Sequence, residues 1–163
     1  MIETIKFRKE VRPTDTKHVR NILASTGFFH DFEIDVAIEL VEEFLSKGAK
    51  SGYIFLFAEL GKNTIGYSCF GPIPCTKHSF DLYWIGVHED YRGKGLGRKI
   101  LRETEIYIRE MQGRKIFIET SSTMKYLPTR NFYLQNGYRE AALLKDFYGT
   151  GDSKHIYEKS LSD

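Results

Sequence analysis

Three glycines alternate with other residues in a short segment that could bind a phosphate group. The segment is Arg92-Gly93-Lys94-Gly95-Leu96-Gly97-Arg98, and it lies between an apolar run and an amphipathic one. Glycines lack the side chain that would obstruct a tight turn, so successive backbone N–H groups can close on an anion at the start of a helix. Arg92, Lys94 and Arg98 add positive charge. The segment therefore predicts a binding site for a pyrophosphate.

Two other nucleotide-binding motifs do not fit this segment. A P-loop has the pattern GxxxxGK[ST], and Arg98 stands where the lysine of that pattern would follow Gly97. A dinucleotide-binding loop has the pattern GxGxxG, whereas the glycines here run GxGxG. ATP hydrolysis and nicotinamide chemistry therefore lose support.

Hydrophobic periodicity predicts the elements that must position this loop. Helical spacing of apolar residues indicates helices at 14–25, 34–45, 96–111 and 129–135. Continuous or alternating apolar runs indicate strands at 53–58, 65–70, 80–87 and 116–118, and two final strands flank a loop at 147–151. The order reads β-α-α-β-β-β-α-β-α-β-β, which is typical of a layered α/β domain, and it covers residues 1–163.

Length and charge restrict the class of protein. A chain of 163 residues suits one domain, and 24 Lys and Arg against 22 Asp and Glu give a net charge of +2, which makes no case for nucleic-acid binding. No run approaches the roughly 18 apolar residues that a membrane span needs. The sequence starts without a signal or transit pattern, so we expect a cytoplasmic protein that binds neither nucleic acid nor membrane.

The two cysteines, Cys69 and Cys75, give no sign of a metal site. They form no CxxC pair, and no histidine stands beside them at metal-ligand spacing. Cys69 lies in a strand pattern without an adjacent histidine to activate its thiol, so a covalent mechanism is not favoured. The sequence predicts no bound metal.

Residues Val87 to Gly97 and the helix after them resemble the GNAT superfamily of N-acetyltransferases. The acyl-CoA motif of that family looks like [RQ]xxGxG[GA], and residues 92–97 show the related RGxGxG form. The resemblance extends over the whole order of elements and implies a GNAT-like layered fold with a mixed central sheet. It also implies that backbone N–H groups from Arg92 to Arg98 hold the pyrophosphate of acetyl-CoA, while the edge of the Val87 strand binds its pantetheine arm.

A second motif resembles the later part of the same family. Phe132-Tyr133 followed by Gly137-Tyr138 matches the pattern FYxxxG[FY]. The resemblance implies that Tyr133 donates a proton to the departing CoA thiolate, which suits a phenol whose ordinary pKa lies near 10. The alternative is a core tyrosine whose hydroxyl satisfies a backbone group. The family often carries asparagine after the fifth strand, whereas this chain has Ser121 and Ser122.

Amine attack on a thioester needs a proton acceptor, and two carboxylates compete for this role. Asp81 lies six residues before Val87, where several family members place a glutamate base. Glu119 lies near the end of the predicted fifth strand. For both residues, a carboxylate that only joins a hydrogen-bond network at the end of a strand is an equal alternative.

The acceptor site is predicted from two aromatic and acidic loops that the resemblance places beside the acyl group. The candidate residues are Phe29 and His30 in one loop, and Asp146 and Tyr148 in the other. Aromatic rings and carboxylates together suit an ammonium group, although the same residues could form a packed loop and a turn.

Together these features predict an N-acetyltransferase that moves an acetyl group from acetyl-CoA to an amine by direct attack in a ternary complex. The acceptor is a small molecule or a peptide, and the sequence leaves a homodimer open. The alternative from another class is a noncatalytic domain that binds or senses acyl-CoA. Tyr133 argues against the alternative.

Overall fold

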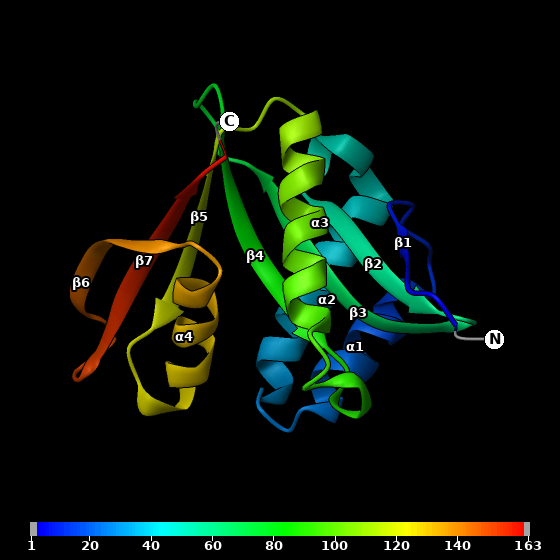
Figure 1. Cartoon of the computed structure of the whole chain (residues 1–163), viewed down its shortest axis with the longest axis horizontal. Coiled ribbons are helices and arrows are strands. Elements are labelled where there is room, and N and C mark those ends of the chain that lie inside the picture. The colour runs from blue at the N-terminus through cyan, green and yellow to red at the C-terminus, as the bar shows by residue number, and fades with distance from the viewer. Residues whose placement is uncertain (1–2, 162–163) are drawn as a thin grey trace. The chain divides into compact units, whose positions relative to one another are not determined.

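The secondary structure follows the predicted order from the first strand to the last (Figure 1). The structure is a computed structural model, and it describes residues 3–161. The elements are β1 (Lys6–Arg8), α1 (Asp15–Ser25), α2 (Asp31–Lys47), η1 (Gly48–Ser51), β2 (Ile54–Leu60), β3 (Asn63–Pro72), β4 (Ser79–Val87), η2 (Glu89–Tyr91), α3 (Leu96–Glu110), β5 (Lys115–Ser121), η3 (Met124–Tyr126), α4 (Leu127–Gln135), β6 (Arg139–Gly149) and β7 (Asp152–Ser160).

The strands of the described residues form a mixed sheet in the order β1-β2-β3-β4-β5-β7-β6. Strands β4 and β5 pair in parallel, whereas β1 with β2, β2 with β3, β5 with β7 and β6 with β7 pair antiparallel. The predicted layered α/β fold with a mixed sheet is therefore confirmed. None of the helices in residues 3–161 is both long enough and apolar enough to cross a membrane.

The chain divides into two compact units, and β4 contributes to both. Unit 1 runs up to Gly71 and includes Trp84–Tyr107, and unit 2 comprises Pro72–Tyr83 and the chain from Ile108 onward.

In unit 1, helices α1 and α2 cover one face of β2 and β3. Their apolar stripes, with Ile22 and Val41 fully buried, pack against Phe55, Phe57 and Tyr67 of the sheet. This face depends on a close approach at Gly86 of β4, because a Cβ there would lie 3.0 Å from a methyl carbon of Leu23. The periodic residues that predicted both helices are thus the ones that build the larger core of unit 1.

Helix α3 packs on the other face of β2 and β3, in front of them in Figure 1. Leu96 and Ile100 are buried there against Ala58 and Ile65. Ile65 reaches this face because β3 carries one extra residue in its pairing with β2, between the pairs Ala58–Gly66 and Glu59–Thr64. The hydroxyls of Ser68 and Thr104 add a buried hydrogen bond of 2.7 Å between β3 and α3.

In unit 2, helix α4 covers one face of β5 and β7. Tyr133 of α4 lies with its ring centroid 6.4 Å from that of Tyr157, which pairs with Ile118 in the sheet. Successive residues of a strand point to opposite faces, so Glu119 lies on the face away from α4. The two faces of this unit therefore carry different groups.

Several boundaries differ from the sequence prediction, and two of these differences change the description of the candidate acceptor segments. Helix α2 begins at Asp31 rather than near 34, because the Glu33 carboxylate accepts a hydrogen bond of 3.0 Å from the backbone N–H of His30 and caps the helix earlier. Strand β6 continues to Gly149, so Phe147 and Tyr148 belong to the strand and the turn is confined to Thr150 and Gly151. Aromatic side chains in this segment were expected in a loop.

Replacing Gly66 by alanine should destabilise the protein by about 1–3 kcal/mol, the usual cost of overpacking. A Cβ at Gly66 would lie 2.6 Å from Cδ1 of Ile100 and 3.0 Å from the backbone oxygen of Gly86, so α3 or the sheet must move. Urea unfolding measures the change. Gly149→Ala is the control, because no atom lies within 4 Å of a Cβ there. Ile100→Val in the Gly66→Ala background should recover part of the loss, since it removes Cδ1.

Candidate active site

The glycine-rich segment forms a turn that leads from β4 into α3. Gly93 and Gly95 have φ angles of +74° and +78°, in the left-handed region that favours glycine. A Cβ at either position would meet no atom within 4 Å, so it is the backbone conformation, rather than a lack of space, that calls for glycine. The loop therefore presents bare backbone.

The first turn of α3 supplies hydrogen-bond donors beside this backbone. Its first intrahelical bond runs from the N–H of Lys99 to the carbonyl oxygen of Gly95 at 3.2 Å. The N–H groups that precede Lys99, those of Leu96, Gly97 and Arg98, belong to the helix start, where no partner one turn back exists. Together with the helix dipole, these donors favour an anion at this end of α3.

The basic side chains of the loop lie at the surface. Arg92 donates a hydrogen bond of 3.0 Å to Glu89, and both side chains are more than half exposed. The Lys94 ammonium lies 6.0 Å from the ring centroid of Tyr91. Exposed ion pairs of this kind are weak, so Arg92 can exchange Glu89 for a phosphate at little cost.

The loop is anchored to unit 1 at both of its ends. Before it, the backbone N–H of His88 donates to the carbonyl of Ile65 at 2.8 Å, and that of Glu89 donates to Ser25 Oγ at 3.0 Å. After it, Leu96 is buried in the cluster under α3, and partly buried Val87 packs on the same cluster. The predicted cofactor-binding residues, from Val87 to Arg98, thus form one continuous segment.

Tyr133 is buried in unit 2 within a group of aromatic rings. Its ring centroid lies 5.4 Å from that of Phe132 and 5.8 Å from that of Tyr138. Burial raises the pKa of Tyr133 well above its ordinary value, so the phenol keeps its proton at neutral pH.

A buried hydroxyl shares the face on which Tyr133 lies. Thr120 is two residues beyond Ile118 on β5 and points to the same side, and its Oγ1 has no hydrogen-bond partner in the described part of the chain. Burial of an unpaired hydroxyl costs free energy. This face therefore carries a buried hydroxyl, that of Thr120, without a hydrogen-bond partner among the described residues.

Asp81 and Glu119 lie near each other on the opposite face of unit 2. Asp81 pairs with Phe117 across the parallel β4–β5 ladder, and Glu119 is two residues farther along β5 on the same side. Burial raises the pKa of Asp81, the negative charge of Glu119 raises it further, and Lys154 lowers it. Glu119 itself forms an ion pair of 2.9 Å with Lys154.

The two candidate acceptor residues of unit 1 lie before α2. Phe29 packs edge-to-face on Phe28 at 4.9 Å and on Trp84 at 5.4 Å. The ring of His30 stacks on Phe32 at 5.4 Å. Phe29 therefore packs against the core of unit 1, whereas His30 and Phe32 are exposed.

The two candidate acceptor residues of unit 2 differ from each other. Asp146 has a φ of +55°, and its carboxylate accepts a hydrogen bond of 2.9 Å from the N–H of Gly151, so it stabilises the turn between β6 and β7. Tyr148 is half exposed, and its pKa is raised by burial and then by the charges of Glu119 and Asp152. Tyr148 therefore lies in the electrostatic surroundings of Glu119.

Two buried basic residues of unit 2, Arg130 and Lys154, have structural roles that the sequence did not predict. Arg130 is buried and donates to the backbone oxygens of Ser121 and Thr123 at 2.8 and 2.9 Å, so it stabilises the turn after β5. Lys154 is buried beside Glu119. Lys154 lies on β7, the last strand, and the predicted strand in this region is the one feature of the sequence that pointed to it.

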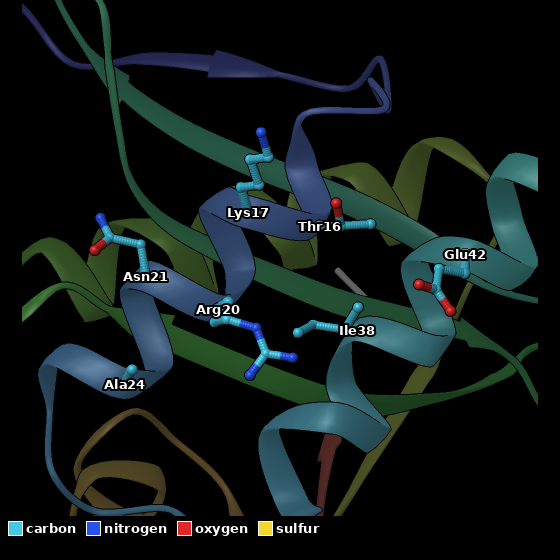
Figure 2. Close-up of a pocket in the computed structure, with 7 residues that line it drawn as sticks. All are labelled: Thr16, Lys17, Arg20, Asn21, Ala24, Ile38 and Glu42. Carbon is cyan, nitrogen blue, oxygen red and sulfur yellow. The ribbon is translucent and has the colours of Figure 1, made fainter. Parts of the chain in front are cut away.

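Two other features lie outside this site. A pocket of about 510 Å³ lies between α1 and α2 in unit 1, where Figure 2 shows Arg20 and Ile38 pointing toward each other. Arg20 forms an ion pair of 2.7 Å with Asp35 in this region. Within residues 3–161, no group of three or more His, Cys, Asp or Glu side chains could hold a metal ion.

Comparison with known proteins decides the family. A family model described as an acetyltransferase (GNAT) domain matches residues 51–140. A crystal structure from Desulfovibrio desulfuricans, of a protein assigned to the GNAT family, is 44% identical, with a TM-score of 0.95 over 98% of this chain and 100% of that one. The chain belongs to the GNAT family of acetyltransferases. Among curated proteins, no sequence matches it.

More distant GNAT structures share the fold alone. The aminoglycoside 6'-N-acetyltransferase from Enterococcus faecium is 16% identical, with a TM-score of 0.77 over 98% of each chain. The PaiA N-acetyltransferase from Thermoplasma acidophilum, in complex with coenzyme A, is 19% identical, with a TM-score of 0.71 over 96% of this chain and 99% of that one. The segment matched by the GNAT model includes the glycine-rich loop, Asp81, Glu119 and Tyr133.

Gly95→Glu should abolish the rise in melting temperature that acetyl-CoA causes, because a carboxylate in the loop would repel the phosphates and fill their place. Differential scanning calorimetry with and without acetyl-CoA measures this rise. The matched control is Gly52→Glu, because Gly52 has a φ of +80° and open space around a Cβ, as Gly95 does. Both variants carry the same backbone strain and charge, and only the control should keep the rise. An equal rise in melting temperature in the two variants would show that the loop is not part of the binding site.

Proposed function

We propose that this GNAT acetyltransferase transfers the acetyl group of acetyl-CoA to an amine by direct attack in a ternary complex. The observation that carries the proposal is the turn at Gly93 and Gly95, with its left-handed glycines and bare backbone at the start of α3. Such a turn suits a pyrophosphate, which is one of the charged groups of CoA. In this proposal Arg92, Lys94 and Arg98 add attraction, and the Val87 strand edge binds the pantetheine arm.

Tyr133 acts as the acid of the reaction. When the amine nitrogen attacks the carbonyl carbon, the carbon–sulfur bond breaks and the sulfur leaves as a thiolate, which takes the phenolic proton of Tyr133. The phenol carries its proton at neutral pH, as this role requires.

Asp81 acts as the base and takes the proton that the attacking amine loses. Its carboxylate has no hydrogen bond or ion pair among the described residues, whereas Glu119 is held by Lys154. A partly buried carboxylate with a raised pKa is suited to accept a proton near neutral pH. Glu119 is then the second carboxylate of the site, and Lys154 holds its charge.

A covalent route through Cys69 has little physical basis. Its side chain is fully buried in unit 1, and burial raises the pKa of the thiol well above its ordinary value. A thiol in this state supplies almost no thiolate at neutral pH, and the thiolate is the nucleophile. Direct attack by the acceptor amine is therefore the simpler mechanism.

We assign the acceptor to the class of cationic amines. Tyr148 is a half-exposed aromatic ring near the carboxylate of Asp152, and a ring beside a carboxylate suits an ammonium group. Phe29, His30 and Asp146 complete the proposed acceptor residues. The Enterococcus faecium structure with this fold is that of an aminoglycoside acetyltransferase, and an aminoglycoside is one cationic amine to test.

A noncatalytic domain that binds or senses acyl-CoA is the second candidate, because the loop alone would serve that function. An assay that follows CoA release over a panel of amines separates the two. Release that depends on one amine supports the transferase and gives its substrate class. Binding of acetyl-CoA without release for any amine supports the sensor.

Tyr133→Phe should reduce kcat by about tenfold to ten-thousandfold, the span expected for the loss of one acid catalyst, and leave acetyl-CoA affinity unchanged. Steady-state kinetics and calorimetry measure the two quantities. Tyr138→Phe is the matched control, because Tyr138 is equally buried and packs against Tyr133. A Tyr133→Phe enzyme with full turnover would exclude this residue as the acid.

Alanine at Tyr148, Asp146 or Phe29 should raise the KM of the acceptor and leave that of acetyl-CoA unchanged, because these side chains touch only one substrate in the proposed complex. The initial-rate kinetics vary each substrate at a saturating level of the other. Asp146→Asn keeps the turn acceptor for Gly151 and removes the charge, so it separates attraction of the acceptor from stability of the turn. An anionic preferred acceptor, or KM values that ignore all three alanines, would refute the placement.

A further inference from the structure

Lys154 is a buried cation in unit 2 that has no part in the reaction as described so far. It lies on β7, where it pairs with Ser121 of β5 on one side and Leu144 of β6 on the other. Its side chain is only 11% exposed. A lysine this far from water needs partners, because an unpaired buried charge is costly.

Its partners are a carboxylate and two aromatic rings. The ammonium nitrogen lies 2.9 Å from Glu119 Oε2. It also lies 3.6 Å from the ring centroid of Phe147 and 5.5 Å from that of Tyr148, within the range of a cation–π contact. The aromatic rings of Phe147 and Tyr148 on β6 thus lie over the ammonium, which is in contact with Glu119.

Several charged and titratable groups face this cluster from the elements around it. Glu119 on β5 and Lys154 on β7 act on Asp81 of β4. Asp152 of β7 and Tyr126 of η3 act together with Glu119 on Tyr148. Ser121 Oγ donates a hydrogen bond of 2.5 Å to Asp152, which fixes that carboxylate at the end of β5. Of these groups, Lys154 is the one cation that acts on Asp81.

We propose that Lys154 is a positioning residue that binds the charge of Glu119 and so reserves Asp81 as the single proton-accepting carboxylate of the transfer. The inference rests on the proposed acetyl transfer and deepens it. Lys154 touches neither the thioester nor the amine in this scheme. It acts through Glu119.

Two neighbouring carboxylates behave differently with and without a cation. Without one, their repulsion makes the pair retain a shared proton to a higher pH, and neither group is reliably available as a base. With Lys154 bound to Glu119, that carboxylate stays ionised and its repulsion of Asp81 is offset. Asp81 then titrates as one group. Its pKa is raised by burial and by the charge of Glu119, and it is lowered by the charge of Lys154.

The test is the rising limb of kcat/KM against pH, which reports the base of the free enzyme. Lys154→Met keeps the apolar stem and removes the charge, so the pKa of Asp81 rises and the limb should move up by about one pH unit. Glu119→Gln removes the repulsion, so the limb should move down. The limb of Lys154→Arg should stay near that of the parent enzyme. The limb of the double variant Lys154→Met, Glu119→Gln should lie between those of the two single variants.

The matched control is Lys115→Met. Lys115 forms an ion pair of 3.1 Å with Glu158 between the same two strands, but it is not among the groups that act on Asp81. This variant loses the same charge and a similar cross-strand pair, and its limb should stay in place. An equal shift in Lys115→Met, or shifts of the same sign in Lys154→Met and Glu119→Gln, would overturn the proposal.

A second measurement does not need turnover. Carboxyl-carbon NMR of the full chain labelled in aspartate, with Asp81→Asn to assign the signal, follows the titration of Asp81 directly. Its midpoint should rise in Lys154→Met and fall in Glu119→Gln, and an unmoved midpoint would refute the charge arrangement. If these shifts occur while no amine supports CoA release, the proposed transfer fails and the charge arrangement stands.

Discussion

The approach of α3 to β3 at Gly66 is the constraint on which the glycine-rich loop depends. Because Gly66 has no side chain, Ile100 and Leu96 can lie directly on the strand, and the first turn of the helix is fixed against the core of unit 1. The loop between β4 and α3 is then held at both ends, by the bond from His88 to Ile65 and by the burial of Leu96. A loop with several glycines is flexible by itself, so this anchoring is what keeps its N–H groups in one arrangement.

The same physical reasoning separates what the sequence predicted from what it did not. Periodicity located the helices because each helix turns an apolar stripe toward a buried cluster. The glycine pattern located the loop because φ is positive at Gly93 and Gly95. Periodicity could not reveal the bulge at Ile65, because a single extra residue in β3 changes the face of that residue without changing the local composition. The early start of α2 also depends on one hydrogen bond, from His30 to Glu33, which propensity alone does not specify.

The candidate site was predicted in part for a similar reason. Motif spacing drew attention to Asp81, Glu119 and Tyr133, but the partner of each group depends on strand register. Lys154 lies against Glu119 only because β7 pairs antiparallel with β5 in the register that places Lys154 beside Ser121. Asp146 illustrates the opposite case, because its carboxylate is engaged by Gly151 within its own turn, and a sequence cannot distinguish that use from ligand binding.

The proposed acid and base lie on opposite faces of the sheet of unit 2, and this arrangement limits where the reaction can occur. Tyr133 packs on Tyr157 and so belongs to the face of Ile118, whereas Asp81 and Glu119 belong to the other face. A thioester that meets both groups must therefore reach from one face of the sheet to the other. Backbone hydrogen bonding between β4 and β5 blocks this path wherever the two strands are paired. The β4–β5 ladder runs from Ser79–Lys115 to Asp81–Phe117, so Asp81 stands at its last pair. The proposed mechanism therefore requires the proton transfers to take place beyond that pair, where the β4–β5 ladder no longer separates the face of Asp81 from the face of Tyr133.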